Sequence, residues 1–412
     1  MRYGIPYKGS KNKIAEYVIE NIPAACNFYD LFAGGCAITH AALLSGKYEN
    51  FFANDIGGAP GLFLDAISGK YKNENRWISR EDFFRLKDKE PYIKYCWSFG
   101  NNGNSYLYSK EVEPWKKALH FARVFNDFSL FKTFGIDIKS ADYKTIIENE
   151  EEFKKKYIQW YVKKHFKKNI DYEEMCRNLE NKIKENTEIL RNYLIDGLKK
   201  SGKTAAQVDR FLGNQMSGHY FGKSQWAFPT REEYTKLQSF LYLPLDYEKI
   251  YGLQNLYESL QRLQRLQSLQ SLQSLQRLQS LQSLQSLKSL QRLQSLETTK
   301  SDYRKIEIKK DSVIYCDIPY FQTDGYETEF DHNSFYEWCR KQTELVIISE
   351  YQMPEKLFKR VSFIEKYQTL SGGTGAKKKE GLFVPVHQIE LYNRMMSKTP
   401  LPDGQLLFDF AA

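Results

Sequence analysis

Carboxylates and glycines occur at two points where the sequence pattern ends a strand. The turn after Asp30 contains Gly34 and Gly35, and glycines at a strand-to-helix turn let a ligand approach the backbone closely. Asp55 follows the strand-like residues 51–54, where a carboxylate can accept hydrogen bonds from a ribose diol. Taken alone, both features fit equally well an ordinary glycine turn and an exposed carboxylate.

A third segment favours a ligand site. Asp317-Ile318-Pro319-Tyr320 follows the apolar run SVIYC, so a carboxylate, a backbone fixed by proline and an aromatic ring all lie after a strand. In α/β folds ligands bind at the carboxyl ends of the strands. The three segments together therefore predict a nucleotide-type site.

The elements around these segments predict one α/β domain split by a long insertion. Apolar, strand-like runs occur before residue 70 and again after residue 299, whereas residues 77–242 are polar, charged and aromatic. The insertion is expected to be mostly helical, with solvated helices in its Lys/Glu-rich part. The expected divisions are residues 1–75 (first catalytic part), 76–245 (insertion), 246–298 (repeat), 299–395 (second catalytic part) and 396–412 (tail).

A low-complexity tract carries leucine at every third residue from Leu260 to Leu296, separated mainly by Gln-Ser and Gln-Arg. A period of three advances about 300° per leucine on an α-helix, so the leucines wind around the helix and form no coiled-coil seam. Leu, Gln and Arg favour helix, which predicts a long helical spacer; a solenoid-like stack is the alternative. The tract carries no catalytic group.

Composition narrows the class of protein. Of 412 residues 42% are hydrophobic and 15% aromatic, which excludes general disorder, and the net charge of +9 attracts polyanions. No apolar run is long enough for a membrane span, and the N-terminus is too polar for a secretory signal, so we expect a soluble cytoplasmic protein. The cysteines form no C-x-x-C pair, which argues against a disulfide framework or a zinc site; they are Cys26, Cys36, Cys96, Cys176, Cys316 and Cys339.

The motifs resemble those of a known family. Asp317-Ile318-Pro319-Tyr320 resembles the Asp-Pro-Pro-Tyr motif of amino-methylating DNA methyltransferases, and residues 32–35 resemble their Phe-x-Gly-x-Gly loop. Residues 7–11, Tyr-Lys-Gly-Ser-Lys, resemble their N-terminal cofactor motif. The order is that of the Dam-like, alpha-group adenine methyltransferases, particularly the phage type. The resemblance covers residues 1–70 and 299–395 well and the middle more loosely.

The resemblance implies a fold and a reaction. The fold would be a Rossmann-like sheet that binds S-adenosylmethionine (SAM), with an inserted, mostly helical DNA-recognition domain. The reaction would be methylation of the exocyclic N6 of adenine in double-stranded DNA, with the base flipped out of the helix. The Asp317 carboxylate and the Ile318 carbonyl would each accept a hydrogen bond from the amino group, Pro319 would keep Ile318 extended, and Tyr320 would stack on the base. Ile318 replaces the first proline of the family motif but keeps its carbonyl, and no metal is implied.

The resemblance also implies the cofactor contacts. Lys11 would neutralise the SAM carboxylate with Tyr7 packed nearby, and Asp302 would lie near the cofactor adenine. Cys36 replaces the last glycine of the loop and is expected to be a small buried residue. The full set of cofactor-binding residues expected is Tyr7, Lys11, Phe32, Gly34, Gly35, Asp55 and Asp302.

Two parts of the insertion are candidates for DNA contact. The segment 99–108 resembles the Asn- and Gly-rich hairpin of Dam-like enzymes; its asparagines could read adenine edges and its tyrosines could stack or wedge, although a plain solvent loop is the alternative. The residues concerned are Asn101, Asn102, Asn104, Tyr106 and Tyr108.

The second candidate is a helix-turn-helix after residue 201. Thr204 could cap its first helix, Gly213 could make the turn, and residues 215–221 could begin its second helix. Asp209 occupies a position where such motifs usually carry a small apolar residue. A helical hairpin that supports the loop is the equal alternative.

The sequence thus predicts a SAM-dependent, adenine-specific DNA methyltransferase in the cytoplasm of a bacterium or a phage-infected host. The same acceptor pair would serve the exocyclic amine of cytosine, which is the nearest rival. A non-catalytic helix-turn-helix DNA-binding protein is the rival of another class. The enzyme could act alone, as a phage methyltransferase, or with a cognate restriction endonuclease in a restriction-modification pair.

Overall fold

A computed structural model describes residues 3–138, 142–166, 172–223, 226–247, 250, 272–319, 330–367 and 377–398. The chain forms two compact units. One unit combines Met1–Leu107 with Gln273–Ala412, and the other is Tyr108–Leu272. Residues 76–107, which the sequence assigned to the insertion, and the described end of the leucine repeat pack into the unit that contains the sheet.

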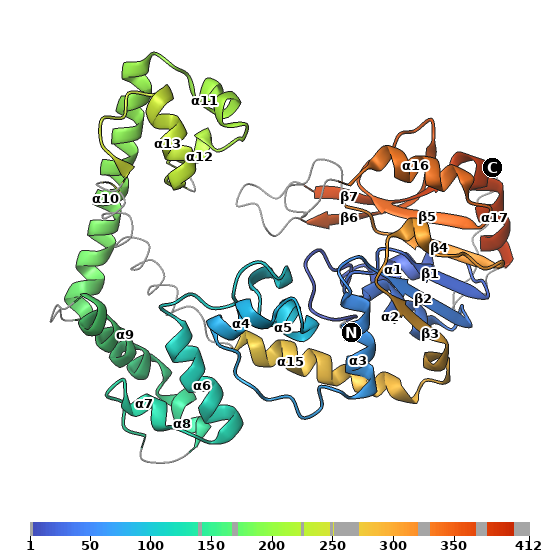
Figure 1. Ribbon diagram of the computed structural model, residues 1–412, viewed down its shortest axis with the longest axis horizontal. Coiled ribbons are helices and arrows are strands. Elements are labelled where there is room, and N and C mark those ends of the chain that lie inside the picture. Colours follow the sequence, from blue (N-terminus) through green and yellow to red (C-terminus); the bar gives the residue numbers. More distant parts are fainter. Residues whose placement is uncertain are drawn as a thin grey trace. The chain divides into compact units, whose positions relative to one another are not determined.

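The first unit is built on a seven-stranded sheet with the order β3-β2-β1-β4-β5-β7-β6 (Figure 1). The pairs β3–β2, β2–β1, β1–β4 and β4–β5 are parallel, and β7 runs antiparallel to both of its neighbours. This mixed α/β architecture confirms the predicted Rossmann-like fold class. The strands are β1 (Asn27–Asp30), β2 (Asn50–Asn54), β3 (Leu296–Thr299), β4 (Ser312–Cys316), β5 (Leu345–Glu350), β6 (Phe358–Tyr367) and β7 (Lys377–Pro385).

The strand order reverses direction at β1, which pairs with β2 on one side and β4 on the other. Asp30 at the end of β1 lies opposite Ala53 of β2 and Tyr315 of β4. Parallel strands present their carboxyl ends at the same edge, and this switch point is where open α/β sheets bind ligands. The segments that follow β1, β2 and β4 are therefore brought together.

The central strands are buried, as their unbroken apolar sequences require. Every residue of β4 and of β5 is buried. Ile314 and Cys316 of β4 pack in one core with Phe335 and Cys339 of α16 (His332–Lys341). This core fixes the position of α16 beside the carboxyl end of β4.

Further helices of this unit pack on the sheet or on one another. Helix α2 (Ala37–Ser45) packs on β1 and β2, and α3 (Ala59–Ser68) packs on β3. The N-terminus of α2 begins directly after the glycine loop. The remaining described helical elements of this unit are α1 (Ala15–Glu20), α4 (Arg80–Leu86), α5 (Pro91–Cys96), α15 (Gln273–Ser283), α17 (Ile389–Lys398) and the 3-10 helices η1 (Phe99–Asn101), η2 (Leu284–Ser289), η3 (Gln291–Ser295), η4 (Tyr303–Lys305) and η5 (Val386–Gln388).

The described end of the leucine repeat changes helix type. Leu275, Leu278 and Leu281 are buried on one side of α15, and Leu284 and Leu287 are buried in η2. On an α-helix a period of three moves off one face after a few turns, whereas a 3-10 helix has three residues per turn and keeps such leucines aligned. The change to 3-10 geometry therefore keeps the leucines facing α3, which both α15 and η2 contact.

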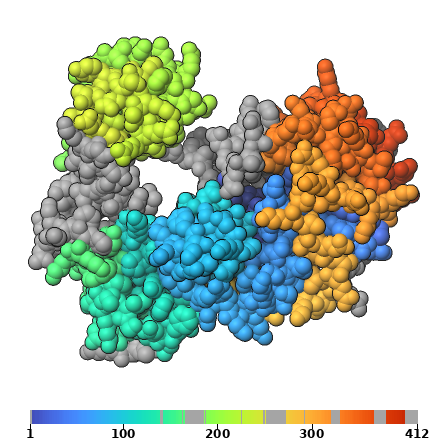
Figure 2. Space-filling model, viewed as in Figure 1, coloured from blue at the N-terminus to red at the C-terminus, as the bar shows by residue number. Residues whose placement is uncertain are grey.

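From Gln273 onward the repeat is thus part of the first unit. Figure 2 shows the segment from residue 273 onward, in yellow and orange, against the blue residues of the same unit. Leu296, the last leucine of the tract, begins β3 and pairs with Phe51 of β2. The long helical spacer predicted from the sequence is here a short helix, two 3-10 helices and an edge strand.

The second unit contains helices and no strand over its described residues. An aromatic cluster of Trp115, Phe131, Phe134 and Tyr157 joins its first helices. A second core, which includes Leu194, Val208 and Tyr234, joins the later ones. The helices are α6 (Glu113–Phe125), α7 (Ser129–Lys132), α8 (Tyr143–Glu148), α9 (Glu150–Phe166), α10 (Tyr172–Ser201), α11 (Ala205–Leu212), α12 (Ser217–Phe221) and α13 (Arg231–Phe240).

Among the described residues no helix combines the length and apolar character that crossing a membrane would need.

Candidate active site

The glycine loop after β1 is held by contacts that only glycine permits. Gly34 has a φ of 46°. A Cβ on Gly34 would lie 2.8 Å from the Tyr7 ring, and one on Gly35 would lie 2.6 Å from the Tyr7 Cβ. The N-terminal motif and the glycine loop, distinct in the sequence, are therefore packed directly on each other.

Cys36 ends this loop in a conformation that favours glycine. Its φ is 57°, and it precedes the first residue of α2. The side chain is fully buried, and burial raises the pKa of its thiol well above the usual range. A thiol kept neutral is a packing residue, not a nucleophile.

Asp55 links the glycine loop to the end of β2. The Gly34 N–H donates to Asp55 Oδ2 at 3.1 Å, and the Gly57 N–H donates to Oδ1 at 2.7 Å. Burial raises the pKa of Asp55, although these two N–H groups and the charge of Lys94 oppose the shift. The carboxylate is thus oriented by the backbone of the loop that it holds.

Asn54, which the sequence analysis missed, ties three strand ends together. Its side-chain amide donates to the carbonyls of Leu31 at 3.1 Å and Ser301 at 3.0 Å. Its Oδ1 accepts from Thr299 Oγ1 at 2.8 Å and from Ser301 N at 3.1 Å. The only signal in the sequence was an asparagine directly before Asp55.

Asp317, directly after β4, forms a buried ion pair with Lys11. Lys11 Nζ lies 2.8 Å from Asp317 Oδ1 and 2.8 Å from Glu380 Oε1. Burial acts to lower the pKa of Lys11, but the charges of Asp317 and Glu380 outweigh it, so the pKa is raised. The ammonium therefore remains protonated although it is only 4% exposed.

Glu380 of β7 is the second residue that the sequence analysis missed. It is 1% exposed and also accepts a hydrogen bond from Ser349 Oγ of β5 at 2.9 Å. A buried carboxylate requires such partners. Lys11 was expected to neutralise a cofactor carboxylate; in the structure its ammonium pairs with two carboxylates of the chain, because a buried cation needs counter-charges.

Asp30, the last residue of β1, adds a further carboxyl group to this edge. Thr39 Oγ1 donates to Asp30 Oδ2 at 2.7 Å. Burial raises the pKa of Asp30 to about 7, with smaller contributions from the charges of Asp317 and Asp55. The carboxyl ends of β1, β2 and β4 thus form an acidic cluster in which Lys11 is the buried cation.

The rest of the segment after β4 is anchored on both sides. Ile318 is buried in the core that also contains Phe335 of α16. The carbonyl oxygen of Pro319 lies 2.9 Å from His332 Nε2, and that of Phe330 lies 3.0 Å from His332 Nδ1. Tyr320 lies outside the described residues. The peptide that carries the Ile318 carbonyl is therefore fixed by its neighbours.

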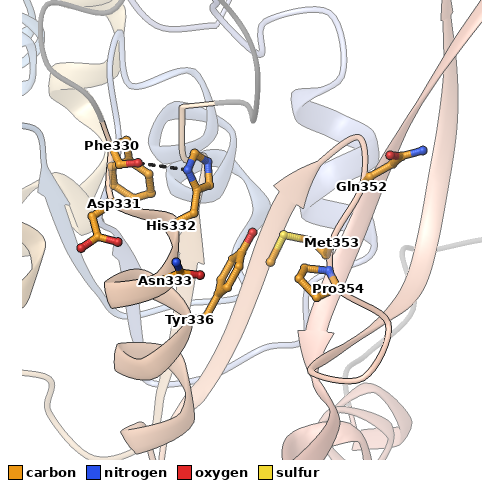
Figure 3. Close-up of a pocket in the computed structure, with 8 residues that line it drawn as sticks. All are labelled: Phe330, Asp331, His332, Asn333, Tyr336, Gln352, Met353 and Pro354. Carbon is orange, nitrogen blue, oxygen red and sulfur yellow. Dashed lines mark hydrogen bonds between the residues drawn. The ribbon is translucent and has the colours of Figure 1, made fainter.

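A cavity of about 760 Å³ opens beside His332. Figure 3 shows it between the N-terminal turn of α16 and the segment that follows β5. Its lining combines rings with amides: Phe330, Asp331, His332, Asn333, Tyr336, Gln352, Met353 and Pro354. Since His332 contacts the Pro319 carbonyl, the cavity is adjacent to the end of β4.

On the other side of the switch point, Phe32 belongs to an aromatic cluster. Its ring centroid lies 5.1 Å from that of Tyr303 and 5.7 Å from that of Phe330. Asp302, next to Tyr303, is paired with Arg304 at 2.6 Å. Hydrogen bonds from Arg304 hold the pKa of Asp302 below its usual value. The structure therefore places Phe32 near η4, which Asp302 caps.

The Asn-rich loop, residues 97–107, forms a hairpin. The Phe99 N–H donates to Ser105 O, and the Leu107 N–H donates to Trp97 O. Asn101 donates from its side chain to Tyr95 O, and Asn102 Oδ1 accepts from the Asn104 N–H. Two of the three asparagines thus shape the loop itself.

The two tyrosines of this region are not exposed, as stacking on a DNA base would require. Tyr106 and Tyr108 are both buried, and the Tyr106 hydroxyl donates to Ile78 O at 2.7 Å. A phenol that satisfies a buried carbonyl is held inward. Phe99 is instead the exposed ring of the loop, with 68% of its surface accessible.

The helix-turn-helix candidate folds into α11, a turn and the short α12. Thr204 caps α11 in a capping box with Gln207, and Gly213 has a φ of 71°. Asp209 accepts hydrogen bonds from Ser217 N at 2.8 Å and Ser217 Oγ at 2.6 Å. Asp209, which does not fit the helix-turn-helix pattern, therefore stabilises the start of α12.

Together, the sheet topology and the carboxylates at its switch point define a Rossmann-like fold with a candidate ligand site. Comparison with a family model then identifies its class. The model of the D12 class N6 adenine-specific DNA methyltransferases matches residues 7–189. The match supports the predicted resemblance and indicates an adenine-specific DNA methyltransferase; it does not reach the Asp317 motif.

The match includes the N-terminal motif, the glycine loop and the Asn-rich loop, and it ends before Asp317. A comparison with curated proteins gives no match. Among the residues that the structure describes, no group of three or more His, Cys, Asp or Glu side chains could hold a metal ion.

Proposed function

We propose that this enzyme transfers a methyl group from SAM to N6 of an adenine that has been flipped out of double-stranded DNA. The observation that carries the proposal is the convergence at the switch point. The glycine loop and Asp317 follow the adjacent strands β1 and β4, and Lys11 and Asp55 connect them to the N-terminal motif and β2.

The residues present suit a cationic cofactor. The cluster of Asp30, Asp55, Asp317 and Glu380 carries more acid than Lys11 neutralises, and the sulfonium of SAM is positively charged. Glycines at the end of β1 offer backbone that a ligand can approach. SAM supplies the electrophilic methyl group. The residues proposed to hold it are Tyr7, Lys11, Phe32, Gly34, Gly35, Asp55 and Asp302.

The acceptor pair acts on the amino group of the base. The lone pair of an exocyclic amine is conjugated into the ring, so the amine is a poor nucleophile. Hydrogen bonds to the Asp317 carboxylate and the Ile318 carbonyl would draw the amino nitrogen toward tetrahedral geometry, so that its lone pair becomes available for attack. Lys11 fixes Asp317 through Oδ1, and Pro319 with the buried Ile318 side chain fixes the carbonyl.

The cavity beside His332 is proposed as the pocket for the extruded base. Phe330 and Tyr336 supply aromatic surface, and Asn333 and Gln352 supply amides that can pair with a base edge. Tyr320, by resemblance, would stack on the base. The pocket adjoins the acceptor pair, because Pro319 and His332 are in contact.

Double-stranded DNA is the proposed partner, contacted by Asn101, Asn102 and Asn104 together with the exposed Phe99. The net charge of +9 favours this polyanion. We place the enzyme in the cytoplasm of a bacterium or phage-infected host, acting alone or with a cognate restriction endonuclease.

The direct test is incubation with tritiated SAM and unmethylated DNA, followed by digestion of the DNA to nucleosides. We expect label in N6-methyladenine for the wild type. Asp317→Ala should lose about a hundredfold to a thousandfold in rate, because it removes one of two acceptors from a preorganised site. Glu337→Ala, an exposed carboxylate of α16, is the matched control and should retain activity.

Two results would contradict the proposal. Label in N4-methylcytosine would assign the enzyme to the other exocyclic amine. Equal transfer by the wild type and Asp317→Ala, with both variants folded and binding SAM, would remove Asp317 from the chemistry.

A further inference from the structure

The end of the leucine repeat contacts the base of the Asn-rich loop. Arg277 of α15 donates from Nη1 to the carbonyl oxygens of Cys96 at 3.0 Å and Ser98 at 2.8 Å. We propose that Arg277 is a positioning residue that fixes the Asn-rich loop for DNA recognition. The proposal rests on the proposed function, in which that loop contacts DNA.

The two carbonyls need a donor from outside their own helix. Cys96 is the last residue of α5, and the final carbonyls of a helix have no partner within it. Both Cys96 and Ser98 are buried, so water does not readily supply the missing hydrogen bonds. A guanidinium at a helix C-terminus also interacts favourably with the helix dipole.

The peptide that Arg277 holds is continuous with the loop. Ser98 Oγ accepts from the Gly103 N–H at 2.9 Å, and Ser98 forms an antiparallel bridge with Tyr106. Phe99 and Asn104, which follow this base, are exposed. Rotation of the Ser98 peptide would therefore move the side chains that the loop presents.

Helix α15 is itself fixed, so Arg277 acts from a rigid support. Leu275 and Leu278, on either side of Arg277, are buried, and α15 contacts both α3 and α5. Farther along, Gln282 donates to the carbonyls of Tyr71 at 3.2 Å and Lys72 at 3.1 Å. The repeat thus places one arginine in a defined position against the loop.

The repeat supplies its own test. Arg277→Ser converts the triplet 275–277 into the Leu-Gln-Ser found elsewhere in the tract and removes a side chain that reaches both carbonyls. Lys288→Gln converts Leu-Lys-Ser into Leu-Gln-Ser and removes one positive charge from an exposed position of η2, so it is the matched control.

We expect Arg277→Ser to raise KM for DNA about tenfold and to reduce the preference for the target sequence over one-base variants by a similar factor. The Kd for SAM should stay within about twofold, since the cofactor site is untouched. Hydrogen exchange of amides 97–107 should accelerate about tenfold or more. Arg277→Lys should recover part of each effect, and Lys288→Gln should match the wild type.

Hydrogen exchange separates this proposal from the proposed function, because it needs no activity. A wild type that methylates no DNA would overturn the function, while the exchange of the loop would still test Arg277. Exchange and KM in Arg277→Ser equal to those in Lys288→Gln would overturn the positioning role. If Arg277→Ser does not fold, Arg277→Lys carries the test, with about threefold changes expected and wild-type behaviour overturning the proposal.

Discussion

At the scale of single residues, some groups of the site could be predicted from the sequence and others could not. Asp55 and Asp317 could be grouped in advance, because each follows an apolar strand. Glu380 could not, because it lies in a strand that begins Lys-Lys-Lys and gives no sign of burial. Its role depends on the approach of Lys11, from the other end of the chain.

The acidic cluster predicts a pH dependence of stability through Asp30. Burial raises its pKa to about 7 in the folded protein, against about 4 in an unfolded chain. The folded state then binds the proton more tightly, so this contribution to stability is complete below about pH 4 and is lost as the pH rises through about 7. Asp30→Asn cannot ionise, and its amide oxygen can still accept from Thr39. We expect the fall in Tm between pH 5 and pH 8 to be smaller in Asp30→Asn than in the wild type by several degrees.

The comparison of slopes, not of absolute Tm values, isolates Asp30. Other groups titrate equally in both proteins, including His40, whose pKa burial lowers to about 4. Asp65→Asn, at an exposed carboxylate paired with Lys70, is the control and should keep the wild-type slope. Parallel Tm curves for the wild type and Asp30→Asn would show that Asp30 does not titrate in this range.

At the scale of elements, the strands that could be predicted are the buried parallel ones. β1, β2, β4 and β5 carry continuous apolar runs, whereas β6 and β7 are rich in Lys and Glu and resemble loops or solvated helices. β3 could not be predicted, because it begins at the last leucine of the repeat. The repeat itself could not be placed, because its period alone does not say which surface buries the leucines.

The packed repeat predicts a stability effect that an inert spacer would not show. Leu281 is fully buried in α15, which contacts α3. Leu281→Ala should lower the free energy of unfolding by about 2–5 kcal/mol, since it removes buried methyl groups and leaves a cavity. Urea denaturation measures the change. Gln279→Ala, on the exposed side of the same helix, should change the free energy of unfolding by less than about 0.5 kcal/mol. Equal effects of the two substitutions would show that the leucines of the repeat do not stabilise the fold.

At the scale of the whole molecule, the insertion separates the halves of one sheet. The strand order places β1, from the first half, directly beside β4, from the second, so the acceptor pair and the glycine loop depend on strands far apart in sequence. The recurrence of apolar runs on both sides of the insertion predicted this split. The points of division could not be predicted, because they depend on how residues 76–107 and 273–298 pack.

The basic net charge predicts different salt dependences for the two ligands. Binding to DNA releases the counterions that its phosphates hold, so the logarithm of the affinity falls steeply with the logarithm of the salt concentration. SAM carries little net charge, and the pairs that fix its proposed site, such as Lys11 with Asp317, are buried from screening. Between 50 and 200 mM salt we expect the Kd for DNA to rise at least about tenfold and the Kd for SAM to change by less than about twofold.

Fluorescence anisotropy with a labelled duplex and calorimetry with SAM measure the two constants. A Kd for DNA that does not change with the salt concentration would mean that phosphate contacts contribute little to binding. A Kd for SAM that rises in parallel with that for DNA would mean that the SAM site is open to solvent ions.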